Sequence, residues 1–243
     1  MPPDLTDDTQ LDKIRITKET RESIREAIPK QYARYAGIEP YFIPLFGRTY
    51  WLRLEKVLEL ARKDASRHTG YIADIGCGLG VLVALLGKTL DARIVGIDRY
   101  PTGPLKAAED VCKTLSSGGS CSFIRSEISL LPFQSGVFQS CFCLDVLEHV
   151  PNVEACLEEI WRVMKNRGSL FITVPVEGKV LNLAREIESL HGRRRATSPH
   201  WHGTVADYKE FEVCLSKYFT ILKKEYVPNA LLAYDVLFSC KKQ

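Results

Sequence analysis

The segment at residues 72–80, Ile-Ala-Asp-Ile-Gly-Cys-Gly-Leu-Gly, constrains the fold of this chain more than any other. A short apolar run surrounds an acid, three glycines then alternate with other residues, and an apolar run of helical length follows. Glycine accepts left-handed backbone conformations and lets a ligand approach the main chain, and a helix that begins there presents free N–H groups. The segment therefore predicts a strand, a tight turn and a helix N-terminus at a ligand-binding site.

Downstream of this segment, short apolar runs alternate with runs of helical periodicity. The expected strands are Tyr71–Asp74, Arg93–Ile97, Cys121–Arg125, Phe138–Cys143 and Ser169–Val174, and the expected helices between them are Val81–Thr89, Pro104–Leu115 and Val153–Met164. This alternation predicts a parallel sheet with helices on both faces. Two further runs, Thr220–Tyr226 and Leu231–Cys240, meet at Pro228-Asn229 and predict a closing antiparallel hairpin.

The ends of this pattern suggest the domain organisation. Residues 1–47 are polar and then rich in aromatics, and we expect a helical, aromatic cover there, ahead of an α/β domain at 48–243 that opens with a helix at Arg48–Lys63. Before a helix at Val205–Leu215, residues 176–204 are too long for a plain connection and are expected to form a lid.

Composition excludes several classes of protein. A net charge of +3 does not provide the basic face of a nucleic-acid binder. No apolar run has the length of a membrane span, and the N-terminus carries no secretory signal pattern, so a cytoplasmic location is expected. The eight cysteines include no Cys-x-x-Cys pair, which indicates buried thiols and no metal site.

The glycine loop discriminates between two classes of cofactor. A dinucleotide loop has the spacing Gly-x-Gly-x-x-Gly, but here Gly80 comes one residue early and Val81 occupies the last position. Asp74 would repel a pyrophosphate, whereas it suits S-adenosylmethionine (SAM), which has no phosphate and carries an ammonium group. Asp98, at the end of the second strand, can accept hydrogen bonds from ribose hydroxyls in either class.

Four motifs, in order, resemble those of the class I SAM-dependent methyltransferases, in particular the type 11 and quinone-biosynthesis-like group. They are the glycine loop, the run Glu-Ile-Ser-Leu-Leu-Pro-Phe at 127–133, Leu-Asp-Val-Leu-Glu-His-Val-Pro at 144–151 and the turn at 163–168. The resemblance implies a Rossmann-like, seven-stranded, mostly parallel sheet with a C-terminal antiparallel hairpin and an N-terminal helical cover. It also implies SAM as the methyl donor and S-adenosylhomocysteine (SAH) as the product.

The resemblance assigns roles to individual residues as well. Glu127 would bind the adenine amino group and the N–H of Ile128 a ring nitrogen. Independently of the resemblance, the position of Arg99 next to Asp98 would let it pair with that acid or cover the adenine. The expected cofactor-binding residues are Asp74, Gly76, Cys77, Gly78, Gly80, Asp98, Arg99, Glu127, Ile128 and Leu144.

Candidates for the acceptor side come from other segments. The candidate general bases are His149, His200 and His202, each with a structural role as the alternative. The candidates for contact with the acceptor are Tyr41, Arg193, Arg194, Arg195 and Trp201. The three arginines suit an anionic acceptor or anionic lipid heads at a membrane surface, and a solvated charged turn is the alternative.

The predicted function is in-line transfer of a methyl group from SAM to a small-molecule or lipid-like acceptor, with oxygen preferred over nitrogen or carbon. A non-catalytic SAM-binding protein and an NAD(P)-dependent oxidoreductase remain as alternatives. A protein or RNA methyltransferase is disfavoured, because the Asn-Pro-Pro-Tyr motif is missing after the fourth strand.

Overall fold

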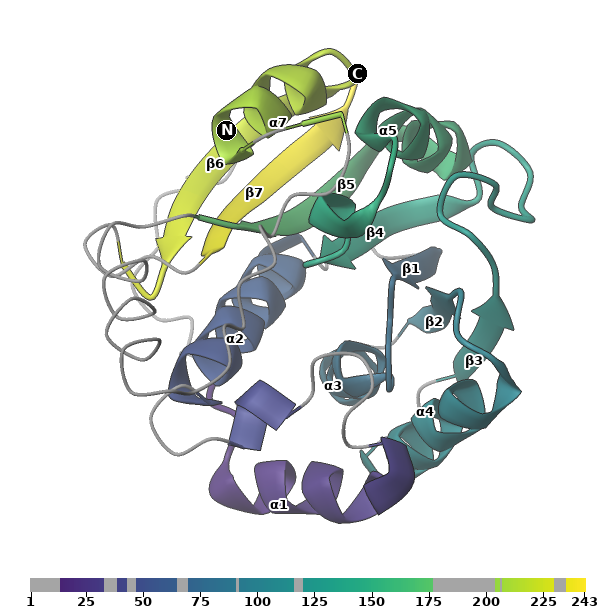
Figure 1. Ribbon diagram of the computed structural model, residues 1–243, viewed down its shortest axis with the longest axis vertical. Helices are drawn as coiled ribbons and strands as arrows, with labels where there is room; N and C mark the ends of the chain where they lie inside the picture. Colours follow the sequence, from purple (N-terminus) through teal and green to yellow (C-terminus); the bar gives the residue numbers. More distant parts are fainter. Residues whose placement is uncertain are drawn as a thin grey trace, which may run out of the picture.

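The computed structural model describes residues 14–32, 39–42, 47–64, 70–90, 92–115, 120–176, 204–205, 207–229 and 235–243. Within these ranges, seven strands form one sheet in the order β3-β2-β1-β4-β5-β7-β6 (Figure 1). The strands are β1 (Tyr71–Ile75), β2 (Arg93–Asp98), β3 (Ser120–Arg125), β4 (Phe138–Leu144), β5 (Met164–Pro175), β6 (Phe219–Val227) and β7 (Asp235–Lys242).

The pairing of the strands confirms the predicted fold class. The strands β1 to β5 run parallel to their neighbours, whereas β7 pairs antiparallel with both β5 and β6. The result is a Rossmann-like α/β fold whose mostly parallel sheet is closed by an antiparallel hairpin.

Helices cover both faces of the sheet (Figure 1). The helical elements are α1 (Lys18–Ala27), η1 (Lys30–Tyr32), η2 (Glu39–Phe42), α2 (Gly47–Asp64), α3 (Val81–Thr89), α4 (Thr102–Leu115), η4 (Leu147–His149), α5 (Val153–Val163) and α7 (Tyr208–Ser216). The helices α1 to α4 contribute to one apolar cluster, and α5 and α7 contribute to another. The strands separate the clusters, because successive side chains of a strand point to opposite faces.

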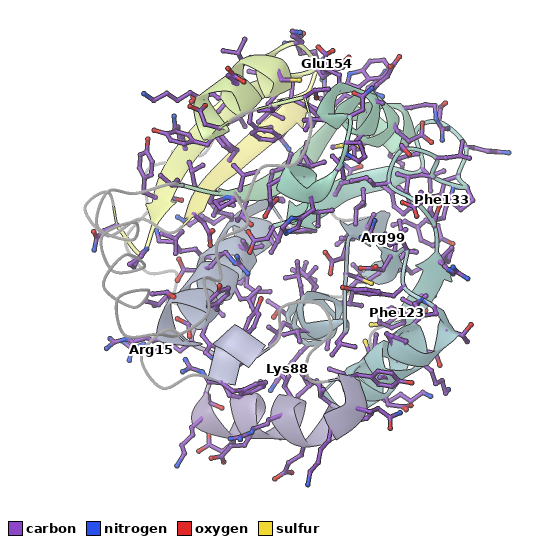
Figure 2. All side chains as sticks on the ribbon, viewed as in Figure 1. Arg15, Lys88, Arg99, Phe123, Phe133 and Glu154 are labelled. Atoms are coloured by element: carbon purple, nitrogen blue, oxygen red, sulfur yellow. The ribbon has the colours of Figure 1, made fainter. Side chains whose placement is uncertain are left out.

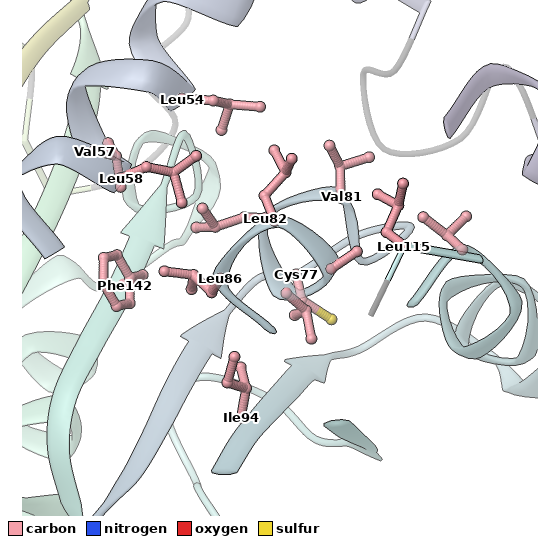
Figure 3. Packing of buried hydrophobic residues seen from close by; sticks show 14 of the residues in the cluster. Leu54, Val57, Leu58, Cys77, Val81, Leu82, Leu86, Ile94, Leu115 and Phe142 are labelled. Atoms are coloured by element: carbon pink, nitrogen blue, oxygen red, sulfur yellow. The ribbon is translucent and has the colours of Figure 1, made fainter. Parts of the chain in front are cut away.

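Buried strand residues show this alternation directly. Ile72 belongs to the first cluster and its neighbour Ala73 to the second. Figure 3 shows Leu58 of α2, Leu86 of α3 and Phe142 of β4 directed toward one another in the first cluster. Because both faces of the central strands are covered, these strands read as continuous apolar runs in the sequence.

The described part of the N-terminal region lies on the face of the sheet that is covered by α1 to α4. Ile24 of α1 is fully buried there. The indole Nε1 of Trp51, in α2, donates a hydrogen bond of 2.9 Å to the main-chain oxygen of Tyr41 and so joins η2 to α2. These contacts place η2 beside the helix that borders the functional site.

Among the described residues, two predicted boundaries differ from the structure by more than two residues. The predicted turn at 163–168 lies largely within β5, where Met164 and Ser169 pair with Phe138 and Ser140 of β4 across a register shift, and Arg167 takes a left-handed φ of 59°. The helix expected from Val205 begins at Tyr208, because the Asp207 side chain accepts hydrogen bonds from two N–H groups of its first turn.

Candidate functional site

A cavity of about 680 Å³ lies at the carboxyl ends of β1, β2 and β4. Its wall includes the glycine loop, the segments that follow β2, β3 and β4, and side chains of α2 and η2. Between β1 and β4 the strand order reverses direction, and α/β sheets bind ligands at such a switch point. The fold therefore provides a ligand-binding crevice at the place where the sequence motifs converge.

The glycine loop needs its glycines for two different reasons. Gly76, Gly78 and Gly80 have φ angles of 79°, 53° and 72°, which L side chains rarely adopt. A Cβ atom on Gly76 would lie 2.2 Å from Cγ2 of Val146. A Cβ on Gly80 would lie 2.9 Å from Cβ of Ala108, so this glycine allows α3 and α4 to pack closely. Gly76 and Gly78 line the cavity, and Gly80 is not among the residues that line it.

Asp98 connects the end of β2 to this loop. Its Oδ2 accepts a hydrogen bond of 2.8 Å from the N–H of Gly78, and its Oδ1 accepts one of 3.1 Å from the N–H of Tyr100. Each carboxylate oxygen retains a second lone pair, which could accept a ribose hydroxyl. Asp98 is thus held in place by the main chain before any ligand binds.

Asp74 is a buried acid in the cavity wall, with an exposed fraction of 3%. Burial, followed by the nearby negative charge of Asp98, raises its pKa to about 8. Such a group holds a proton at neutral pH until a positive charge arrives and stabilises the carboxylate. The electrostatics of this wall therefore favour a cationic ligand over a phosphate.

Residues expected around the adenine lie together. Arg99, labelled in Figure 2 near the end of β2, lines the cavity with Glu127 and Ile128, which follow β3. Cys77 and Leu144 line it as well, so every predicted cofactor residue except Gly80 reaches the cavity. Their contact with a cofactor stays a prediction.

The sequence did not predict the buried cluster of charged residues around Arg53. The Arg53 side chain is 3% exposed, and its Nη1 donates to Asp145 and, over 3.0 Å, to Asp235. Its Nη2 donates to the Tyr41 hydroxyl over 3.0 Å. Burial opposes the charged form, but Tyr41 and Asp235 outweigh it and raise the pKa of Arg53. The two acids lie 92 and 182 residues further along the chain.

One signal for this cluster is present in the sequence. Arg53 lies next to Leu54 and one helical turn before Val57, on the apolar stripe of α2. A charged side chain within a buried stripe needs partners, although the sequence does not reveal which.

The cluster also holds a strained turn after β4. Asp145 has a φ of 54°, uncommon for a residue other than glycine. Besides the bond from Arg53, its carboxylate accepts a hydrogen bond of 2.7 Å from the Thr173 hydroxyl. These partners keep the turn, and the residues that follow it, beside the cavity.

His149, a predicted general base, lines the cavity next to an unexpected acid. The His149 side chain is 55% exposed, whereas that of Glu148 is 3% exposed, and His149 Nε2 lies 3.8 Å from Glu148 Oε1. Oε2 of Glu148 is buried with no hydrogen-bond partner in the described structure. Burial, together with the charge of Asp235, raises the pKa of Glu148 to about 8.

The remaining candidates are placed as follows. Tyr41 lines the cavity. His200, Trp201, His202 and the arginines at 193–195 lie outside the described residues, as does most of the expected lid. Among the residues that the structure describes, no group of three or more His, Cys, Asp or Glu side chains could hold a metal ion. None of the described helices is long and apolar enough to cross a membrane.

Comparisons with known proteins agree with this geometry. Residues 73–172 match the family model described as a methyltransferase domain. The chain is 32% identical over 126 residues to the mitochondrial ubiquinone biosynthesis O-methyltransferase of Mus musculus, covering 47% of this chain and 32% of the relative. It is 23% identical over 119 residues to cycloartenol-C-24-methyltransferase 1 of Oryza sativa subsp. japonica, covering 44% and 34%. The chain thus spans about a third of the length of these relatives.

Solved structures share the fold over most of the chain. The magnesium protoporphyrin IX methyltransferase of Synechocystis PCC 6803, solved with bound SAH, has a TM-score of 0.64 at 17% identity, covering 94% of this chain and 96% of its own. The [4+2]-cyclase SpnF has a TM-score of 0.59 at 16% identity, covering 79% and 83%. At these identities the likeness concerns the fold.

The first prediction tests the close approach at Gly76. Gly76→Ala should destabilise the protein more than Gly136→Ala, because both positions have a positive φ but a Cβ on Gly136 would meet nothing within 4 Å. The backbone strain common to both is about 1–2 kcal/mol. Urea denaturation measures the difference. Equal losses of stability would show that the Val146 side chain can move away from the added Cβ without destabilising the protein.

The second prediction concerns the pH dependence of stability. The pKa of Glu148 is about 8 in the folded protein against an ordinary value of 4.5, so the folded state binds the proton more tightly. The free energy of unfolding should therefore fall as the pH rises from about 4.5 to 8. Urea denaturation at intervals across this window should show a shallower fall for Glu148→Gln than for wild type and for the exposed control Glu158→Gln. Identical slopes in all three proteins would contradict the raised pKa.

Proposed function

We propose that this chain is a class I SAM-dependent methyltransferase and transfers the methyl group of SAM to a small-molecule or lipid-like acceptor. The observation that carries the proposal is the cavity in which buried Asp74 and the loop-anchored Asp98 face the glycine loop. The methyltransferase family match over residues 73–172 supports it, as does the shared fold with a methyltransferase that has SAH bound.

The residues of the cavity fit SAM part by part. Asp98 offers free lone pairs to the ribose hydroxyls, and Glu127 with the N–H of Ile128 suits the adenine edge. Asp74 suits the positive charge of the amino acid end. When bound, SAM supplies an electrophilic methyl group on a sulfonium. The protein contributes alignment of the two reactants, which is worth up to about 7–11 kcal/mol in favourable cases.

The acceptor is proposed from the wall formed by the N-terminal elements. Tyr41, Tyr50 and Leu54 supply aromatic and apolar surface to the cavity, which suits a flat or hydrocarbon molecule. The names of the relatives include both C- and O-methyltransferases, one for cycloartenol and one for ubiquinone biosynthesis. We propose O-methylation in the cytoplasm, with the arginines at 193–195 as partners for an anionic acceptor or a membrane surface.

A non-catalytic or differently catalytic SAM-binding protein is the second candidate, because a [4+2]-cyclase shares this fold. Two experiments separate the candidates. Calorimetry with SAM and SAH tests binding, and incubation with labelled SAM and an extract of metabolites and lipids, followed by mass spectrometry, tests transfer. Absence of binding would overturn both candidates, and binding without any labelled product would favour the second.

The third prediction concerns the two acids. Asp98→Asn and Asp74→Asn should each weaken SAH binding at least tenfold, about 1.4 kcal/mol, whereas the exposed control Asp110→Asn should not. Because the pKa of Asp74 is about 8, SAH should bind the wild type more tightly at pH 8 than at pH 6, and Asp74→Asn should flatten this dependence. Calorimetry at both pH values provides the measurement. Wild-type affinity that does not change with pH would argue against a contact between Asp74 and the ammonium.

A further inference from the structure

Glu148 is a buried acid whose position the fold alone does not explain. It lies in η4, directly after β4, and lines the cavity with an exposed fraction of 3%. Its Oε2 is shielded from solvent and has no hydrogen-bond partner among the described residues. Leaving a buried polar atom unpaired is unfavourable, and such atoms in a cavity wall point to a functional role.

The strand order places Glu148 away from the residues proposed for adenosine. Asp98 ends β2 and Glu127 follows β3, both on one side of β1 in the sheet, whereas Glu148 follows β4 on the other side. Arg53 of α2 lines the same cavity as Glu148, and its Nη1 lies 3.0 Å from Asp235 at the start of β7. A ligand that occupies the adenosine side leaves the Glu148 side of the cavity for a second molecule.

We propose that Glu148 is a catalytic residue that accepts a proton from the nucleophilic hydroxyl or amine of the methyl acceptor. This inference rests on the proposed methyl transfer and defines the substrate class as molecules with an O–H or N–H group at the reacting atom. The acceptor oxygen or nitrogen forms the new bond to the methyl carbon, the carbon–sulfur bond breaks and its electron pair stays on sulfur. The acceptor proton passes to the Glu148 carboxylate, so the methylated product leaves uncharged at that atom.

The surroundings of Glu148 tune it for this role. Burial and the negative charge of Asp235 raise its pKa to about 8, while Arg53 opposes the shift. Arg53 is itself bonded to Asp235 and Asp145, which limits its pull on Glu148. Burial, and then the negative charge of Glu148, raise the pKa of the Cys143 thiol on β4 well above its ordinary value, so this thiol stays protonated and uncharged. A base whose pKa lies near the working pH transfers protons efficiently.

His149 complements this acid rather than replacing it. Its ring is 55% exposed, and its Nε2 lies 3.8 Å from Oε1 of Glu148. A side-chain rotation that brings Nε2 within hydrogen-bonding distance of Oε1, or one bridging water, would let the exposed imidazole carry the proton from the buried carboxyl to bulk water. The pair therefore provides a buried acceptor for the proton and an exit for it.

The test compares wild type, Glu148→Gln, Glu148→Asp and the exposed control Glu158→Gln. Each protein is incubated with labelled SAM and the metabolite and lipid extract, and mass spectrometry identifies the methylated atom. We expect an O- or N-methyl product and a loss of about 10²- to 10⁴-fold in kcat/KM for Glu148→Gln. We also expect partial recovery in Glu148→Asp and no change in the control. With SAM at saturation, so that its pH-dependent binding through Asp74 does not contribute, the wild-type kcat/KM for the acceptor should rise with pH toward about 8, and Glu148→Gln should lose this rise.

Two readouts do not depend on turnover. Calorimetry should show SAH binding to Glu148→Gln within about twofold of wild type, and infrared spectra at neutral pH should lose a protonated carboxyl band in this variant. A large loss of SAH affinity would make Glu148 a cofactor ligand and overturn the proposal. So would a carbon-methylated product with unchanged Glu148→Gln kinetics. SAH binding with no labelled product in any protein would instead overturn the proposed function, and the inference with it.

Discussion

The buried guanidinium of Arg53 holds together the parts of the structure that form the Glu148 side of the cavity. It bonds Asp145 after β4, Asp235 at the start of β7 and the hydroxyl of Tyr41 in η2. A buried charge is tolerated only when it is paired, so these elements cannot separate without exposing an unpaired ion. The Arg53 guanidinium thereby links the N-terminal elements, the turn after β4 and the C-terminal hairpin.

The cavity wall contains Arg53 and Asp145, which form an ion-paired cluster with Asp235, and it also contains two acids that form no ion pair with a lysine or arginine in the described structure, Asp74 and Glu148. Burial raises the pKa of both Asp74 and Glu148 to about 8; the charge of Asp98 adds to the effect at Asp74, and at Glu148 the opposing charge of Arg53 does not outweigh burial and Asp235. A cationic ligand would provide a matching positive charge, and its binding is therefore coupled to loss of protons from the wall. This coupling distinguishes the site from a pocket built for phosphates, in which helix N-termini and arginines dominate.

Most of the fold was predictable from local pattern. The strand β1 and the helix α3 were predicted to within one residue, because apolar runs bounded by turn residues identify buried elements. The start of β5 was missed because a register shift against β4, with a left-handed Arg167, depends on the neighbouring strand. The start of α7 was missed because the cap is formed by Asp207 and not by the apolar pattern.

The sequence by itself determined the glycine loop and its acid, and these sufficed to predict the class of cofactor, because the spacing of the glycines and the position of Asp74 are local properties of one loop. Tertiary structure alone decided which charged groups are buried and what they contact. Arg53, Asp145 and Asp235 are far apart in the chain, and Glu148 and His149 are adjacent residues with very different exposure. The pKa of a side chain depends on its burial and on charges from distant elements, and neither can be read before the chain is folded.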